Sequence, residues 1–119
     1  MTDIPSFQIG DKVNLPRWTD VDPGTVVDVK RKGREVHVRV DSAELAQGEK
    51  PEIVSGGFAG HCTNQRQLKW DITENPDGHI EVFTIRKWRG KFFWTPKGCS
   101  PDGRHRVRHG WRKFHDYNF

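Results

Sequence analysis

The chain contains few of the residues that usually identify a disulfide-bonded, metal-binding or membrane-spanning protein. It has two cysteines, Cys62 and Cys99, and one methionine among 119 residues. The cysteines are far apart and lack C-x-x-C spacing, so we interpret both as reduced thiols. No apolar run approaches the roughly 18 residues of a membrane span, and residues 1–5 do not resemble a signal peptide. We expect a cytoplasmic protein without cofactor, metal or membrane partner.

Motifs for catalysis are also missing. No nucleophile stands beside a base, and no pair of carboxylates has the spacing of an acid and base. His105 and His109 would share one face of a strand, but four residues separate them by about 13 Å, too far to bind one metal. The sequence therefore predicts a binding protein rather than an enzyme.

Signals for helices are scarce, whereas turn signals are frequent. Only residues 42–49 fit a helical turn. We predict an all-β fold in one domain, residues 1–119, built as a small antiparallel sheet or an SH3-like, partly open barrel with long loops. The expected strands are residues 12–15, 25–29, 35–40, 67–72, 79–86, 91–95 and 104–111.

Glycine and proline mark the expected turns. Residues 30–34 read as a hairpin loop in which Gly33 supplies a positive φ, and residues 87–90 read as a second hairpin turn. Pro23 and Gly24 indicate another turn, with the Asp22 carboxylate bonded to backbone amides. In the alternative, Asp20 or Asp22 faces the arginines near the C-terminus.

The expected core is thin, because mean hydropathy is -0.85 and only 33% of residues are apolar. Between residues 36 and 40, valines alternate with polar residues and predict one buried face. The hairpin of residues 79–95 instead has apolar residues on both faces, more than a one-sided sheet needs. We therefore expect a homo-oligomer.

Positive charge is concentrated in the C-terminal half. Residues 1–60 hold eight Lys and Arg against ten Asp and Glu, whereas residues 61–119 hold twelve against six. The net charge is +4 and the sequence pI about 9.3. Such a distribution favours a phosphate-bearing partner, and an acidic protein partner would also fit.

The densest basic motif is R-H-R-V-R-H-G-W at residues 104–111. In an extended strand, guanidinium groups on one face recur about every 6.7 Å, and each fits phosphate or carboxylate in bidentate fashion. The strand would place Arg104, Arg106 and Arg108 on one face and His105, Val107 and His109 on the other.

Aromatic residues accompany these arginines, and together they form the candidate ligand site. Guanidinium groups suit phosphates, and rings suit the flat base of a nucleotide. Gly56 and Gly57 belong to a glycine-rich loop. Its backbone amides could hold an anion, or the loop could simply be a flexible connection. The candidate residues are Phe83, Arg86, Trp94, Arg104, Arg106, Arg108, Trp111, Arg112 and Tyr117, with Gly56 and Gly57.

Two resemblances add expectations. The pattern of Gly, Asp and Val in residues 10–41 looks like the opening of an SH3-like barrel of the KOW or Tudor type. Most of the chain resembles a family of small phage and prophage proteins, through W-T-D-V-D-P-G-T-V at residues 18–26, N-P-D-G at 75–78, F-T-I-R-K at 83–87 and the ending at 110–119. The spacing at residues 112–114 and the extra loop at 55–65 depart from that family.

The phage resemblance implies an accessory protein acting in the cytoplasm of an infected or lysogenic bacterium, without implying a mechanism. One hypothesis is a sponge, similar in role to Thoeris anti-defence proteins, that sequesters a cyclic nucleotide-type immune signal. A second is a nucleic-acid-binding barrel of the SH3 or KOW type. A third is a structural or protein-interaction module whose arginines protect an edge strand.

Overall fold

The computed structural model describes residues 6–17, 20–54, 61–62, 64–98 and 106–115, and these residues confirm the all-β prediction. Among them, no helix is both long and apolar enough to cross a membrane. The strands are β1 (Lys12–Pro16), β2 (Val21–Lys30), β3 (Glu35–Val40), β4 (Ser42–Leu45), β5 (Ile53–Val54), β6 (His61–Cys62), β7 (Trp70–Thr73), β8 (Ile80–Trp88), β9 (Lys91–Pro96) and β10 (Arg108–His109), with a short turn η1 (Arg31–Gly33) between β2 and β3.

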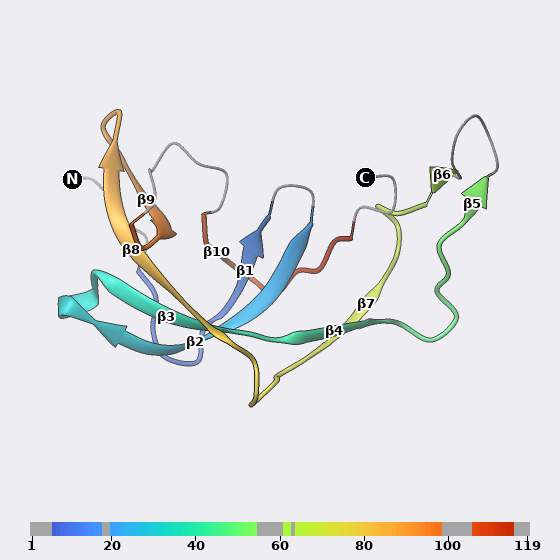
Figure 1. Cartoon of the computed structure of the whole chain (residues 1–119), viewed down its shortest axis with the longest axis horizontal. Helices are drawn as coiled ribbons and strands as arrows, with labels where there is room; N and C mark the ends of the chain where they lie inside the picture. The colour runs from blue at the N-terminus through green and yellow to red at the C-terminus, as the bar shows by residue number, and fades with distance from the viewer. Residues whose placement is uncertain (1–5, 18–19, 55–60, 63, 99–105, 116–119) are drawn as a thin grey trace.

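Six antiparallel strands form the main sheet in the order β10-β1-β2-β3-β8-β9. The sheet curls until its two edges nearly meet (Figure 1). The chain just before β10 makes the contact across the gap, since the amide of Val107 donates to the carbonyl of Trp94 in β9 at 3.1 Å. The result is a barrel that closes along a seam between β9 and β10, in agreement with the SH3-like, partly open barrel expected from the sequence.

The barrel encloses one small apolar core. Val36 and Val38 are fully buried, which confirms the alternation predicted for β3. The register of β2 against β3 shifts between Val26 and Asp28, and such a bulge bends the strand and helps the sheet to curl. The buried cluster consists of Phe7, Val13, Leu15, Val26, Val36, Val38, Phe83, Trp94 and Val107.

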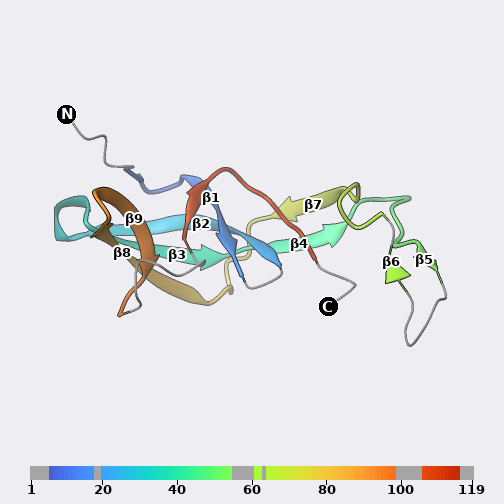
Figure 2. The same cartoon turned by 90° about the horizontal axis from the view of Figure 1, so that it is seen from above.

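A narrow arm of two-stranded sheets extends from the barrel. The β4–β7 pair continues outward from β3 and β8, and β5–β6 lies beyond it (Figures 1 and 2). The predicted helical turn at residues 42–49 is therefore wrong: residues 42–45 are strand β4, because pairing with β7 provides the backbone hydrogen bonds that a lone helical turn would lack.

The predicted turn at Pro23 and Gly24 is also wrong, because both residues lie inside β2. Gly24 is needed there for space: a Cβ at this position would lie 2.6 Å from a methyl carbon of Val38 and 3.1 Å from the carbonyl oxygen of Arg39. The Pro-Gly dipeptide therefore marks a point where β3 packs closely against the backbone of β2, rather than a chain reversal.

Both predicted hairpin turns are confirmed. Gly33 has φ 87°, and Arg89 and Gly90 have φ 51° and 79° between β8 and β9. The strand expected over residues 104–111 is shorter in the described part of the chain, where β10 covers only Arg108 and His109. It ends at Gly110, whose φ of 97° cannot continue a strand.

The barrel and the arm are joined at the buried carboxylate of Asp41, between β3 and β4. Its side chain accepts hydrogen bonds from the Thr25 hydroxyl, from Arg39 Nε at 3.2 Å and from the Asn75 amide at 3.1 Å. Its own amide donates to Pro23. One carboxylate thus ties together β2, β3 and the turn that leads into β8.

Asp41→Asn should lower the free energy of unfolding by about 2–4 kcal/mol. The side chain of the introduced asparagine has one acceptor oxygen for three donors, and it is neutral, so Arg39 loses its buried counter-charge. Urea denaturation measures the loss. Asp71→Asn, an exposed position in β7 opposite Glu44, is the matched control and should change stability by less than about 0.5 kcal/mol. Equal effects of the two substitutions would contradict this role for Asp41.

A second polar network joins the start of β8 to β1 and β2. Arg17 donates to both oxygens of Glu81, at 2.8 and 2.7 Å, and to Asp22 at 3.1 Å. Lys113 also donates to Asp22, at 2.8 Å. The hydrogen bonds from Arg17 hold the pKa of Glu81 below its usual 4.5 despite partial burial. The Asp22 carboxylate pairs with Arg17 and Lys113, rather than with backbone amides of the predicted turn.

The lowered pKa of Glu81 predicts acid sensitivity. A carboxylate with a depressed pKa contributes stability in full above its unfolded pKa, near 4.5, and that contribution is lost as pH falls through the folded value. Unfolding free energies measured by urea between pH 6 and pH 3 should therefore fall for the natural chain. The unfolding free energy of the Glu81→Gln variant should fall less steeply over the same pH range. Parallel pH curves for the two proteins would contradict this role of Glu81.

Candidate anion-binding site

The turn between β2 and β3 carries cations in an unusual backbone conformation. Arg31 and Lys32 have φ of 54° and 55°, ahead of Gly33. A side chain in this left-handed region costs about 1–2 kcal/mol per residue. The turn therefore holds two basic side chains at positions where glycine or asparagine would be less strained.

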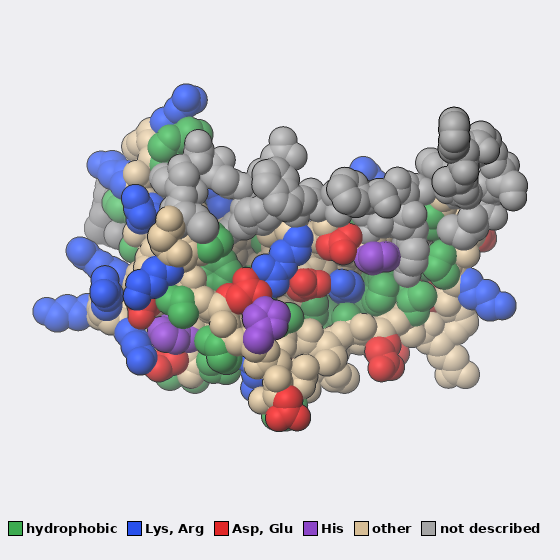
Figure 3. Space-filling view, in the orientation of Figure 1, with side chains coloured by type: hydrophobic (Ala, Val, Ile, Leu, Met, Phe, Trp, Pro, Cys, Tyr) green, Lys and Arg blue, Asp and Glu red, His purple; other side chains and the backbone are tan. Residues whose placement is uncertain are grey.

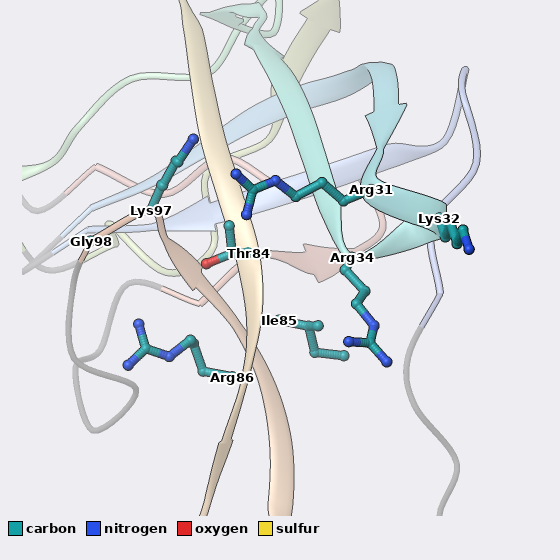
Figure 4. A pocket seen from close by; sticks show the side chains of 8 residues that line it. All are labelled: Arg31, Lys32, Arg34, Thr84, Ile85, Arg86, Lys97 and Gly98. Atoms are coloured by element: carbon teal, nitrogen blue, oxygen red, sulfur yellow. The ribbon is translucent and has the colours of Figure 1, made fainter.

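These cations form one wall of an open cleft of about 870 Å³. We call it the basic cleft. In Figure 4, Arg31 and Lys97 extend toward each other above Thr84, while Arg34 and Arg86 lie on either side of Ile85. The η1 turn, β8 and the end of β9 supply the lining: Arg31, Lys32, Arg34, Thr84, Ile85, Arg86, Lys97 and Gly98.

One buried carboxylate pairs with two of the cations that line the cleft. Glu35 is 7% exposed and lies 3.3 Å from Lys97 Nζ and 3.7 Å from Arg31 Nε. A hydrogen bond with His37, together with Lys97 and Arg31, keeps the pKa of Glu35 below its ordinary value. Glu35 therefore remains ionised at neutral pH and holds Lys97 and Arg31 at the cleft.

One carboxylate does not balance five cations. Among the described residues, Lys32, Arg34 and Arg86 form no ion pair. Basic residues nearer the middle of the barrel do have acidic partners: Lys12 with Glu74, Arg17 with Glu81, Arg39 with Asp41 and Lys113 with Asp22. The described acids therefore leave part of the positive charge of the cleft unpaired. In Figure 3, Lys and Arg side chains gather at this end of the molecule.

A second hollow, of about 310 Å³, lies along the seam of the barrel. We call it the seam pocket. The Arg106 guanidinium lies 3.7 Å from the centre of the Phe93 ring, and the ring of His109 stacks on Phe7 with centres 4.2 Å apart. The pocket is lined by Phe7, Phe92, Phe93, Trp94, Arg106, Val107, Arg108 and His109.

The cleft and the pocket adjoin across the β8–β9 hairpin. Arg86, which lines the cleft, is the cross-strand partner of Phe93, which lines the pocket. Directly opposed residues in an antiparallel pair have side chains on the same face. Guanidinium groups also cover aromatic rings of this hairpin: Arg89 lies 4.6 Å from the Trp88 ring, and Arg106 lies over Phe93. These rings are therefore partly shielded from solvent although they lie on the face of the hairpin that is turned away from the core.

The residues proposed from the sequence are distributed over several places. Arg86 lines the basic cleft, and Arg106 and Arg108 line the seam pocket on either side of Val107, which is buried. Phe83 is a core residue, only 2% exposed, so its ring offers no stacking surface. Trp94 is equally buried, with an edge at the seam pocket.

The other candidates lie elsewhere. The indole N–H of Trp111 donates to the Gly24 carbonyl at 2.9 Å, and Lys12 lies over its ring, so Trp111 holds the C-terminal segment against β2. Arg112 borders a third hollow, of about 240 Å³, with Arg66 and Phe114. The remaining candidates lie outside the described residues: Arg104, Tyr117, Gly56 and Gly57.

Four cations of the basic cleft were missed by sequence reasoning, namely Arg31, Lys32, Arg34 and Lys97. The signal for three of them was present as the run K-R-K-G-R at residues 30–34, which we interpreted only as a hairpin loop. No local pattern links that run to Lys97, because the fold alone brings them together.

Comparison with known proteins provides no identity: no protein-family model, curated protein or solved structure matches this chain.

The strain in the β2–β3 turn predicts that Lys32→Gly stabilises the protein. Glycine relieves the left-handed conformation, and its greater entropy in the unfolded chain offsets part of the gain, leaving about 0.5–1 kcal/mol. Thermal and urea unfolding would measure the change. Arg34→Gly removes the same charge at φ -97° and should destabilise. A loss of stability in Lys32→Gly would show that the lysine side chain itself stabilises the turn.

Proposed function

We propose that the protein binds single-stranded nucleic acid, with the phosphate backbone held in the basic cleft. The observation that carries the proposal is the group of cations Lys32, Arg34 and Arg86, without ion-pair partners among the described residues, around an open hollow. Lys and Arg side chains that neutralise phosphates provide most of the affinity in such complexes. Arg86 and Arg34 add planar forks suited to phosphate oxygens.

The shape of the cleft favours a polymer over a compact ligand. Its lining contains five basic residues and no aromatic ring. A small nucleotide in a specific site is normally largely enclosed and has its base packed against apolar or aromatic groups. An open, basic surface instead suits a backbone that passes through and continues beyond it.

The adjoining rings favour a single strand over a duplex. Proteins that bind single strands combine a basic groove with aromatic side chains on which unpaired bases stack. Here Arg86 of the cleft lies opposite Phe93, and Phe92 and Phe93 line the neighbouring pocket. In a duplex the bases are paired and stacked inside, out of reach of these rings.

A second candidate is sequestration of a nucleotide-type ligand, the sponge role suggested beside the phage resemblance. The observation that favours it is the seam pocket, because about 310 Å³ lined by rings and two arginines is within the range of small-ligand sites. A phage accessory protein of this type would hold a cyclic nucleotide signal unchanged and so counter host immunity.

Salt dependence separates the two candidates. A single strand contacting about five cations should lose affinity about 100-fold between 50 and 200 mM salt, from a slope of about 0.7 per phosphate contact. A compact nucleotide in the seam pocket should show a much smaller dependence. Fluorescence anisotropy with a labelled 12-nucleotide single strand would measure the first, and calorimetry with cyclic and linear mononucleotides the second. Tight, salt-insensitive mononucleotide binding would replace the nucleic-acid proposal.

Arg34→Gln combined with Arg86→Gln should weaken binding of the single strand and reduce the salt slope by about 1.4, since two phosphate contacts are removed. Lys50→Gln, an exposed cation in the connection between β4 and β5, is the control and should leave both affinity and slope unchanged. An unchanged slope in the double variant would show that the cleft does not carry the backbone.

A further inference from the structure

We propose that the seam pocket binds one unpaired base of a strand whose phosphates lie in the basic cleft. This inference rests on the proposed function and deepens it, because it assigns a base-recognising subsite beside the backbone site. It also predicts that the protein distinguishes a strand with bases from a strand of phosphate and sugar alone.

The walls of the seam pocket are suited to a flat aromatic group. Phe92 and Phe93 come from β9, and Phe7 comes from the segment that precedes β1. Phe7 packs edge-on against Trp94 at 5.5 Å between ring centres and face-on against His109 at 4.2 Å. Phe7 and Trp94 are buried and therefore form the fixed floor of the pocket. The half-buried rings of Phe92 and Phe93 are the ones that a base can contact, and every nucleobase presents a π face.

Arg106 adds a positively charged guanidinium to the wall of the base site. Its guanidinium carbon lies 3.7 Å from the centre of the Phe93 ring and 5.9 Å from that of the Trp88 ring. A guanidinium held over a ring is restricted in orientation and brings positive charge to this side of the pocket. Arg108 lines the same pocket from the exposed edge strand β10.

The position of the pocket matches that of a base attached to a backbone in the cleft. The two hollows share the β8–β9 hairpin, where Arg86 of the cleft is paired directly across from Phe93 of the pocket. Cross-strand partners have Cβ atoms about 4.5–5.5 Å apart, which is shorter than the distance from a phosphate to the base of its own nucleotide. A strand can therefore contact Arg86 through a phosphate and place a neighbouring base beside Phe93.

The experiment compares two 12-nucleotide single strands, one of thymidines and one of the same length carrying abasic sites throughout. Anisotropy at 100 mM salt should show about tenfold tighter binding of the strand with bases, since one stacked base contributes about that factor. Phe92→Leu keeps an apolar side chain and removes the ring. It should abolish this preference and leave the affinity for the abasic strand unchanged.

Two further variants keep the test decisive. Arg106→Lys retains the charge but loses the planar stack on Phe93, and should lower the preference without changing the salt slope. Phe114→Leu, at the third hollow, is the matched control and should retain the preference. If Phe92→Leu does not fold, judged by its thermal transition, Arg106→Lys and the abasic strand still decide the outcome.

The possible failures are distinguishable. Equal binding of the two strands by the natural chain would overturn the base pocket, while loss of binding in the Arg34 and Arg86 double variant would still support the cleft as a backbone site. Failure of both strands to bind would overturn the proposed function as well. A preference for bases that survives both Phe92→Leu and Arg106→Lys would place base recognition outside the seam pocket.

Discussion

The arrangement of this protein depends on one buried carboxylate. Asp41 bonds the Thr25 hydroxyl, the Arg39 side chain and the Asn75 amide, so it fixes how β3 leaves the barrel and where the chain returns to begin β8. That return sets the register in which Glu35 of β3 lies opposite Thr84 of β8. Because Glu35 pairs with two cations of the basic cleft and Thr84 lines it, this register positions the candidate site.

The distribution of ion pairs follows from the same construction. Where the arm meets the barrel, the acidic side chains lie beside basic ones and pair with them, as Glu74 does with Lys12 and Arg39. At the β2–β3 turn, Glu35 is the one described acid that pairs with cations of the cleft. A small net charge therefore conceals a strongly polarised surface, and it is local imbalance, rather than total charge, that attracts an anionic ligand.

Two chemically different hollows share one hairpin. The basic cleft has cations and no rings, whereas the seam pocket has rings and two arginines. Phosphate and base are the two parts of a nucleotide that demand such different surroundings, because one is charged and the other planar and weakly polar. The closeness of Arg86 and Phe93 across β8 and β9 is the observation behind our proposal that one strand contacts both hollows.

The sequence by itself determined the all-β class, the buried alternation at Val36 and Val38 and the two hairpin turns, because strand periodicity and glycine chemistry are local. It also indicated that Arg106 and Arg108 lie on the strand face opposite Val107, whereas the burial of Val107 came from the structure. Tertiary structure decided the rest: position 24 of β2 needs glycine because the Val38 side chain of the neighbouring strand packs directly against it. The cleft exists because the fold brings residues 31–34 beside 84–86 and 97–98, and Phe83 fills the core because barrel closure buries its face. Contacts between segments so distant in the chain have no local signature, since pairing and packing, not composition, bring them together.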